Sequence, residues 1–238
     1  NKYGAERGNR GLPKLLPGLN FIAGLNGETS STYQQNLSLL REIRSEDLLL
    51  RRINIRQVEG AGFQEIVERD FADFKQSVRD EIDGPLLKEL FPMDAVLRGV
   101  RWESHNGRTR LPAHLSSPHT ESKIRGKAGL TFGRQIGAYP ILIGAEYLIP
   151  LETTSNIVVT GHGARSITGV ESSMDYDTIT EKQLSAIPGI GDKSAWKLIG
   201  ERVKLKRKDS TKSFHDVQSW FSAAGLSWHD DFARFFAD

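Results

Sequence analysis

The segment from Leu19 to Ile43, LNFIAGLNGETSSTYQQNLSLLREI, decides the fold class of the N-terminal part of the chain. Its first residues form a short apolar run that is ended by Gly and Asn, which is typical of a buried strand. The following residues have apolar side chains at helical spacing: Tyr33, Leu37, Leu40 and Ile43. Because Thr29–Ser31 can cap such a helix, the segment predicts a β-strand followed by an α-helix.

The same strand-then-helix pattern occurs a second time. The stretch from Arg51 to Val58, RRINIRQV, alternates strictly between polar and apolar residues, as a strand does. The residues 63–83 that follow carry one apolar helical stripe, made of Phe71, Phe74, Val78 and Ile82. Two βα units in succession indicate part of a parallel α/β sheet or barrel, which we expect to end near residue 90.

Short strands are expected from about residue 91 to residue 172. Runs such as YPILIGAEYLIP (139–150) and NIVVTGHG (156–163) are separated by Gly, Pro and Asn turns, and Asn106-Gly107 favours a tight hairpin. This pattern of short strands separated by turns predicts a small all-β barrel or sandwich, with residues 112–129 as a surface loop. Residues 173–238 have helical patterns, so the sequence predicts three domains: 1–90, 91–172 and 173–238.

Composition excludes several classes of protein. The 238 residues are 38% apolar and 26% charged, with a net charge of +2, which is ordinary for a globular chain. No run of 18 apolar residues occurs, so no membrane span is expected. The absence of cysteine rules out disulfides and thiolate metal sites within this sequence and fits a cytoplasmic location.

Charge is concentrated locally although the chain is nearly neutral. Between Lys193 and Lys212 there are eight Lys or Arg residues and two acids, Glu201 and Asp209. A basic patch of this kind is typical of a surface that meets a polyanion, and its alternative is a solvated loop.

The strand that starts at Arg52 has one apolar and one polar face. Ile53 and Ile55 share the first face, whereas Arg52, Asn54 and Arg56 share the second, because side chains alternate along a strand. In a barrel with outer helices the polar face would point inward, where two guanidinium groups need anionic ligands. The alternative is an edge strand with a solvated polar face.

A glycine-rich turn links the first strand to the first helix. Gly24 and Gly27 flank this turn, and Glu28 precedes the helix. Such a turn at the carboxyl end of a parallel strand lets a ligand approach the backbone. The alternative is a turn with no ligand, in which Glu28 only complements the helix dipole.

The stretch GLPKLLPGLNFIAGLNGETSSTYQQNLSLLREI (11–43) resembles the late βα unit of radical S-adenosylmethionine (SAM) enzymes, and LRRINIRQV (50–58) resembles their final barrel strand. The whole chain is similar to the C-terminal portion of an archaeal group of such enzymes that ends in a helix-hairpin-helix. The resemblance implies SAM beside Gly24, Gly27 and Glu28. It also implies a barrel lining formed by Arg52, Asn54 and Arg56, and a [4Fe–4S] cluster in the full-length protein.

The resemblance also implies a fold class: the last βα units of a partial TIM-type barrel, then a small barrel like TRAM or OB domains, then a helix-hairpin-helix domain. One departure is clear, because three cysteines must bind the cluster and this sequence has none. We expect a fragment whose cluster-binding part lies upstream and would be a partner of this region. The alternative is a degenerate homologue.

The β segment resembles the small TRAM-type barrel of RNA-modifying radical SAM enzymes, which implies that Arg134, Gln135 and Arg165 contact RNA. The alternative is a barrel that only caps the active site. Histidines at 105, 114 and 119 lack the tight spacing of metal ligands, so no metal site is predicted.

The stretch LSAIPGIGDKSAWKLIGER (Leu184–Arg202) carries a helix-hairpin-helix signature. Its glycines permit a tight turn, and backbone amides at the start of the next helix can bind a phosphate oxygen. The candidate nucleic-acid contacts are Gly189, Ile190, Gly191, Lys193, Ser194 and Lys197. We expect the aromatic tail to be the core of a second hairpin, and the alternative is a stacking platform; its aromatic residues are Trp220, Phe221, Trp228, Phe232 and Phe235.

Three functions follow as hypotheses. The first is the C-terminal region of a radical SAM enzyme that modifies RNA or another macromolecule and that is inactive as this Cys-free chain. The second is a non-catalytic module that binds RNA or DNA. The third is a radical SAM enzyme acting on a small molecule or protein, with the hairpin as a packing element.

Overall fold

Two parallel strands form the centre of the first unit of the computed structural model. Strands β1 (Gly18–Ala23) and β2 (Arg52–Gln57) pair in a register that sets Leu19 beside Ile53 and Phe21 beside Ile55. The structure describes residues 4–50, 52–58, 60, 68–105, 130–135 and 140–237. Within these, β1 and β2 pair only with each other, and their predicted strand character is confirmed.

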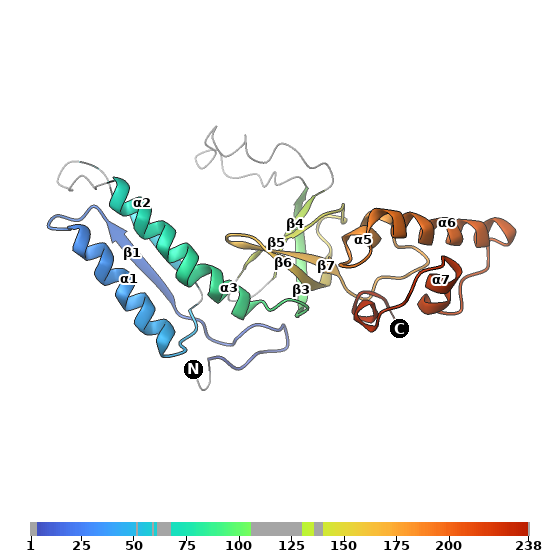
Figure 1. Cartoon of the computed structure of the whole chain (residues 1–238), viewed down its shortest axis with the longest axis horizontal. Coiled ribbons are helices and arrows are strands. Elements are labelled where there is room, and N and C mark those ends of the chain that lie inside the picture. Colours follow the sequence, from blue (N-terminus) through green and yellow to red (C-terminus); the bar gives the residue numbers. More distant parts are fainter. Residues whose placement is uncertain are drawn as a thin grey trace. The chain divides into compact units, whose positions relative to one another are not determined.

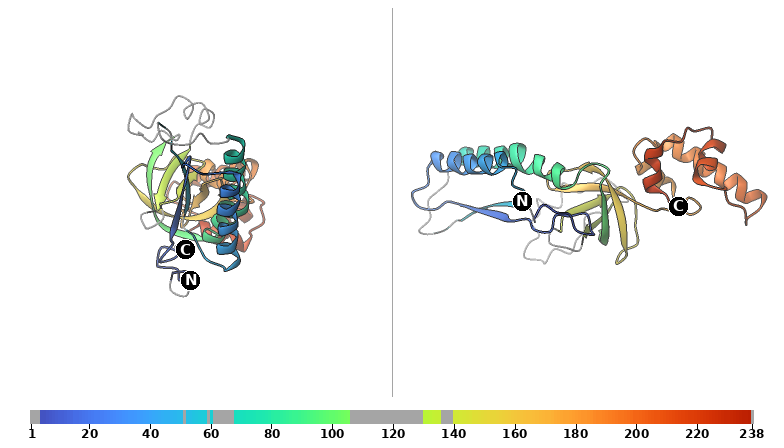
Figure 2. Two further views of the ribbon diagram at one scale, coloured as in Figure 1. Left: turned by 90° about the vertical axis from the view of Figure 1, so that its left-hand side faces the viewer. Right: turned by 90° about the horizontal axis from the view of Figure 1, so that it is seen from below.

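Helices cover one face of this sheet (Figure 1; Figure 2). They are α1 (Ser30–Ser45), α2 (Glu68–Ser77), a π-helix η1 (Val78–Asp83) and α3 (Gly84–Leu90). The predicted apolar stripes are confirmed, because Tyr33, Leu37, Leu40, Phe71, Phe74, Val78 and Ile82 are all buried. The predicted cap is also found, since Thr29 is the N-cap of α1 and its amide donates to Thr32 Oγ1 at 3.1 Å.

A closed barrel of five strands forms the centre of the second unit. The strands are β3 (Val96–His105), β4 (Thr131–Gln135), β5 (Leu142–Ala145), β6 (Thr154–His162) and β7 (Ser166–Glu171), in the order β3-β4-β5-β7-β6. Strand β3 pairs antiparallel with β4 and β6, and β4 pairs antiparallel with β5. Strands β5 and β7 pair parallel, with Ile143 beside Ile167. The interior is filled by fully buried apolar side chains, among them Leu97, Val100, Trp102, Ile143, Ile157 and Ile167. The small all-β barrel expected from the sequence is therefore found.

One glycine of the barrel is required by close packing. A Cβ atom added at Gly133 would lie 2.5 Å from the carbonyl oxygen of Arg101 and 2.8 Å from the indole of Trp102. Trp102 is itself fixed, because its Nε1 donates to Ser155 Oγ at 2.8 Å. Only glycine lets β4 pass the indole at this distance.

The C-terminal residues fold into helices around an aromatic core. The helices are α5 (Glu181–Ala186), α6 (Asp192–Lys208), α7 (Val217–Ala223) and the 3₁₀ helix η3 (Asp230–Phe235). Trp220, Phe221, Phe232 and Phe235 are buried between them, as expected of the aromatic tail. Asp216 caps α7, because its Oδ1 accepts the amide of Ser219 at 2.6 Å.

The predicted fold class is wrong. The described residues form a closed five-strand barrel, a separate two-strand parallel sheet and six α-helices, which matches neither a partial TIM-type barrel nor a helix-hairpin-helix domain. Two βα units show that strands run parallel, but local periodicity does not count the strands of a sheet. Similarly, a turn signature specifies the turn between α5 and α6, whereas the surrounding segment packs α7 and η3 into the same core.

The described chain divides into two compact units. The first contains the residues up to Pro92 together with His162–Arg165, and the second contains the rest of the barrel and the C-terminal helices. The predicted three-domain division stays a prediction. Among the helices that the structure describes, none has the length and apolarity needed to cross a membrane. The predicted hairpin at Asn106-Gly107 and the loop 112–129 lie outside the described residues.

Candidate nucleic-acid interface

The polar face of β2 is exposed rather than enclosed. Ile53 is buried beneath α1 and α2, whereas Arg52 and Arg56 are exposed and Asn54 Nδ2 donates to Asn20 Oδ1 at 2.9 Å. The expectation that Arg52, Asn54 and Arg56 line a barrel interior is therefore wrong, because the sheet has two strands in the described part of the chain. The other interpretation, an edge strand with a solvated polar face, describes the arrangement found.

The turn after β1 is held closed by Glu28. Gly24 and Gly27 have φ values of +95° and +89°, which an L side chain rarely adopts. The Gly24 amide donates to Glu28 Oε2 at 2.7 Å, and Tyr33 Oη lies 3.4 Å from the same oxygen. Burial, followed by the charge of Glu28, raises the pKa of Tyr33. Glu28 thus stabilises its own loop.

The donor set of the chain does not fit an iron–sulfur cluster. The sequence has no cysteine, and the described residues contain no group of three His, Asp or Glu side chains that could hold a metal ion. Of the three histidines considered earlier, His105 bonds through Nε2 to the carbonyl of Ile149 at 2.8 Å, and the other two lie outside the described residues.

The two arginines predicted on the β segment lie in different units. Arg134 lies on β4 in the second unit, half-exposed, with Nε 3.8 Å from Glu103 Oε2. Arg165 belongs to the first unit, where its Nη2 donates to the carbonyl of Ile53 at 3.2 Å and lies 3.6 Å from Asp83 Oδ2. The neighbouring Gln135 is buried and donates to the carbonyl of Arg98 at 2.9 Å. Arg165 and Gln135 thus contribute contacts within the fold.

Arg165 faces a carboxylate that is costly to ionise. Burial raises the pKa of Asp83, and the positive charges of Arg165, Arg79 and Arg52 oppose this rise. The Asp83 side chain is mostly buried, so Arg165 compensates part of the cost of placing a charge there.

The turn from Ile187 to Gly191 joins α5 to α6 as the sequence predicts. Gly189 has a φ of +90°, and a Cβ there would lie 3.3 Å from the ring of Phe232. Ile190 is buried, so the turn is anchored to the helical core. Gly191 is the N-cap of α6 and has no side chain to accept the first amides of the helix, although its carbonyl accepts the amide of Ser194 at 2.9 Å. The amides before Ser194 can therefore meet an anion.

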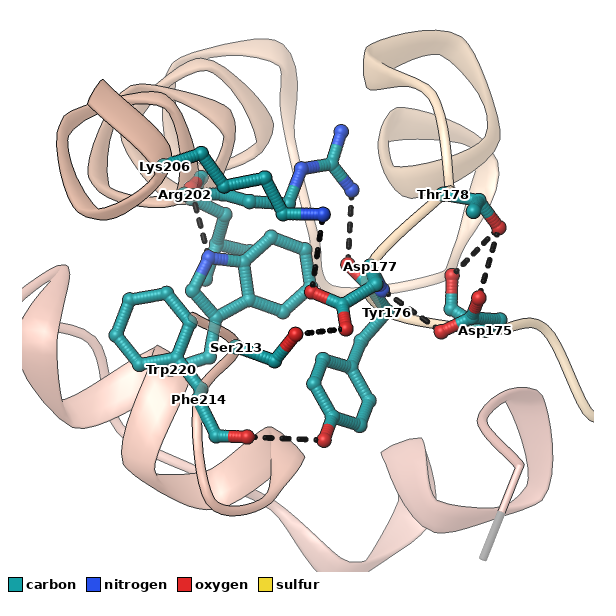
Figure 3. A network of polar contacts seen from close by, with 10 residues as sticks. Asp175, Tyr176, Asp177, Thr178, Arg202, Lys206, Ser213, Phe214 and Trp220 are labelled. Carbon is teal, nitrogen blue, oxygen red and sulfur yellow. Dashed lines mark hydrogen bonds and ion pairs between the residues drawn. The ribbon is translucent and has the colours of Figure 1, made fainter. Parts of the chain in front are cut away.

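The inner face of α6 uses its cations to hold the fold (Figure 3). Arg202 Nη1 donates to the carbonyl of Tyr176 at 2.8 Å, and its guanidinium lies over the ring of Trp220 at 5.6 Å. Lys206 Nζ lies 3.6 Å from Asp177 Oδ1, whose other oxygen accepts the hydroxyl of Ser213. Burial lowers the pKa of Arg202.

The outer face of α6 carries exposed cations. Lys193, Lys197, Arg207 and Lys208 are exposed, and none of them has an ion-pair partner in the part of the chain that the structure describes. Helical spacing places Trp196, Gly200, Val203 and Lys204 on the same side, with Asp192 and Glu201 at its margins. We call the set Lys193, Trp196, Lys197, Gly200, Val203, Lys204, Arg207 and Lys208 the outer face.

Trp196 is the residue that sequence reasoning missed. Its side chain is 68% exposed, although it lies beside Ala195 and one position before Lys197 in a helix whose buried residues are Ala195 and Leu198. The spacing of Lys193, Lys197 and Lys204 around it was visible in the sequence, because residues three, four and seven apart share a helix face.

A small hollow lies between the barrel and the turn. It has a volume of about 240 Å³ and is lined by Glu146, Thr160, Gly161, Thr168, Gly169, Val170, Ala186 and Pro188. Sites for drug-sized ligands begin at about 300 Å³. The acidic Glu146 in its wall makes it a poor place for a phosphate, so the hollow adds nothing to the interface.

Comparison with known proteins gives relatives of greater length. No protein-family model matches the chain. An uncharacterised protein of Archaeoglobus fulgidus is 34% identical over 217 residues, which cover 87% of this chain and 35% of that protein. An uncharacterised protein of Methanocaldococcus jannaschii is 35% identical over 180 residues, covering 71% of this chain and 30% of that protein. The chain therefore spans about a third of the length of the curated archaeal relatives that it matches.

Proposed function

We propose that the turn from Ile187 to Gly191 and the outer face of α6 bind nucleic acid, as part of a longer archaeal protein. The observation that carries this proposal is the division of cations on one helix. Arg202 and Lys206 contact other residues of the fold, the first through a hydrogen bond and the second through an ion pair. Four cations on the opposite side of the helix have no ion-pair partner among the described residues. Unpaired cations beside uncapped helix amides suit a phosphate backbone.

Alternatives for this face are less well supported. A small-molecule or protein substrate gives no reason for a helix face whose charged residues are all positive. A merely solvated face explains the exposure of Lys193 and Lys197, but not the concentration of five cations on one side of the helix with Asp192 and Glu201 only at its margins. Phosphate contacts explain both, because a polyanion attracts the cations and repels Asp192 and Glu201.

The proposal predicts a salt dependence of definite size. Four cations that each neutralise one phosphate of a single strand give a slope of about −3 in a plot of log K against log salt. Affinity then falls by about 50-fold between 50 and 200 mM salt. A titration of the 238-residue chain with labelled RNA and DNA, followed by fluorescence anisotropy, measures this slope.

A pair of double variants isolates the interface. Replacing Lys193 and Lys197 by Gln removes two proposed phosphate contacts, so the slope should become less steep by about 1.4. Replacing Lys14 and Lys88 by Gln removes the same charge from exposed sites of the first unit and should leave the slope unchanged. Equal slopes for the two variants, or no binding at low salt, would contradict the proposal.

A second candidate function concerns the first unit. The ordered turn of Gly24 and Gly27, with exposed Arg52 and Arg56 on the same sheet, favours the proposal that this unit forms part of a radical SAM enzyme and approaches SAM. Cluster ligands would then come from elsewhere in the longer protein. The A. fulgidus relative allows a test of this proposal. The proposal would be refuted if that protein had no three-cysteine motif outside the matched region, or if it contained no iron after anaerobic purification. We also propose a cytoplasmic location, which the lack of cysteine supports.

A further inference from the structure

An exposed indole lies on the charged face, near the start of α6. Trp196 has a side chain that is 68% exposed, the second most exposed of the large apolar side chains in the described residues. Lys193 precedes it by one turn, and Lys197 follows it directly. Exposing an indole leaves a large apolar area in water, and tryptophan is on average a well-buried residue. Among the described residues, none makes a hydrogen bond or a ring contact with this side chain.

A glycine leaves open space beside the indole. Gly200 lies in the interior of the 17-residue helix α6, where glycine costs about 1 kcal/mol relative to alanine. A Cβ added there would meet no atom within 4 Å, so packing does not require glycine. Helical side chains lean toward the N-terminus, and a side chain at position 200 would therefore lean toward Trp196, four residues earlier. Glycine keeps that flank of the indole clear.

The charges around this space select the occupant. On the outer face the charged residues are Lys193, Lys197, Lys204, Arg207 and Lys208. Within the described part of the chain Lys204 is the one with an ion-pair partner, since its Nζ lies 2.6 Å from Glu201 Oε1. An apolar protein segment would not need Lys193 and Lys197 next to the indole and three more cations further along the same face of the helix. A strand of nucleic acid does, because its phosphates meet cations while its bases stack on an aromatic ring.

We propose that the outer face of α6 is a binding site for single-stranded nucleic acid, in which a base stacks on Trp196 over the space left by Gly200. This inference rests on the proposed function and adds to it the form of the ligand and the residue that selects it. Bases of a duplex are already stacked on one another and cannot cover an indole, whereas bases of a single strand can. The site therefore discriminates single strands from duplexes of equal charge.

Tryptophan fluorescence gives a direct readout of stacking. Of the four tryptophans, Trp102 and Trp220 are fully buried and Trp228 is half-buried, which leaves Trp196 as the indole that a base can quench. The experiment titrates the full chain with a 10-nucleotide oligo(U) and with a duplex of equal length. We expect quenching by the single strand, little quenching by the duplex, and no quenching in Trp196→Ala.

Affinity measurements separate stacking from charge. Trp196→Ala should weaken oligo(U) binding by about 5- to 150-fold, the effect of losing one base–aromatic stack, and should change duplex binding by less than about 2-fold. Leu148→Ala is the matched control, because it shortens an exposed apolar side chain of the same unit that lies outside the outer face, and it should leave both affinities unchanged. Circular dichroism checks that each variant is folded.

Each outcome has one interpretation. If Lys193→Gln with Lys197→Gln weakens binding but Trp196→Ala does not, the nucleic-acid interface stands and the stacking site is overturned. Equal binding of the single strand and the duplex by the unmodified chain also overturns the stacking site. If the unmodified chain binds neither at low salt, the proposed function itself fails. Quenching by an apolar peptide but not by oligo(U) would assign the face to a protein partner.

Discussion

Replacing Gly200 by alanine should stabilise the fold and weaken binding at the same time. The stabilising part comes from helix propensity, because alanine in a helix interior is about 1 kcal/mol more favourable than glycine. The structure adds no penalty, since the new methyl group would meet no atom within 4 Å. We therefore expect the free energy of unfolding of the second unit to rise by about 1 kcal/mol.

Urea unfolding measures this gain through Trp220. Its indole is fully buried, and its Nε1 donates to the carbonyl of Leu198 on α6 at 2.7 Å, so its emission reports the loss of this packing. With a slope of about 2 kcal/mol per molar urea, the midpoint should move up by about 0.5 M. In the same variant the methyl group occupies the space beside Trp196, so the affinity for oligo(U) should fall.

The matched control also replaces a glycine by alanine, at a position where alanine should destabilise the fold instead of stabilising it. Gly225 follows α7 with a φ of +67°, and a Cβ there would also meet nothing within 4 Å. Alanine at this position would have to adopt a left-handed backbone conformation, which costs about 1–2 kcal/mol. We therefore expect Gly225→Ala to destabilise the fold without changing the affinity for oligo(U). If Gly200→Ala destabilised the fold, the inference that position 200 has open space for a methyl group would be wrong. A stabilised variant with unchanged affinity would refute the idea that glycine is kept for a ligand.

Three further predictions concern titratable groups and their partners. Burial raises the pKa of Tyr147 above its ordinary value, so the contribution of Tyr147 to stability is complete below about pH 10 and declines above that pH. Tyr147→Phe should therefore reduce the fall of the urea midpoint at alkaline pH. At pH 7 the same variant should lose about 1 kcal/mol of stability, because the Glu171 amide loses its acceptor. Burial also raises the pKa of Asp83, so the contribution of Asp83 to stability is complete below about pH 4 and declines as the carboxyl ionises at higher pH. Arg165 offsets part of the cost of the ionised form, so Arg165→Gln should destabilise the first unit by up to about 1 kcal/mol at pH 7 and by less at pH 3.5. The Ser219 amide lowers the pKa of Asp216, so Asp216→Ala should lower the urea midpoint at neutral pH, by an amount that shrinks below pH 4 as this cap becomes protonated in the unmodified chain.

Local order along the chain could be predicted from the sequence. Alternation in β2 correctly separated the face of Ile53 from the face of Arg52, because period two is a property of any strand, but the expectation that the polar face lines a barrel was wrong. The stripe from Phe71 to Ile82 predicted one buried helix face, although it gave no sign of the π-helical turn at Val78–Asp83. Patterns that depend on neighbours a few residues away were therefore sufficient for these elements.

Pairing between distant segments could not be predicted. Nothing in the residues of β1 and β2 states how many strands join them, so a two-strand sheet was mistaken for part of a larger barrel. The parallel pairing of β5 with β7 in a mostly antiparallel barrel was equally hidden. Strand count and order depend on tertiary packing, which period and turn chemistry do not encode.

The candidate site was predicted in part. The turn glycines and Lys197 were found because they belong to a short motif. Trp196 and Gly200 were missed, since the helix was interpreted through its packing residues. Which cations are free cannot be derived from the sequence, because Arg202 is distinguished from Lys197 only by the contact it makes with Tyr176.

The hydrogen bond from Arg165 to the carbonyl of Ile53 spans 112 positions of the chain. The helices and strands of the first unit are all synthesised by Leu90, yet the guanidinium that compensates its buried Asp83 arrives much later. During translation the N-terminal part folds first. A ribosome stalled between Leu90 and Arg165 should therefore hold a first unit that opens more readily than the finished one. Release of the turn between β6 and β7 from the ribosomal exit tunnel is the step that completes this unit.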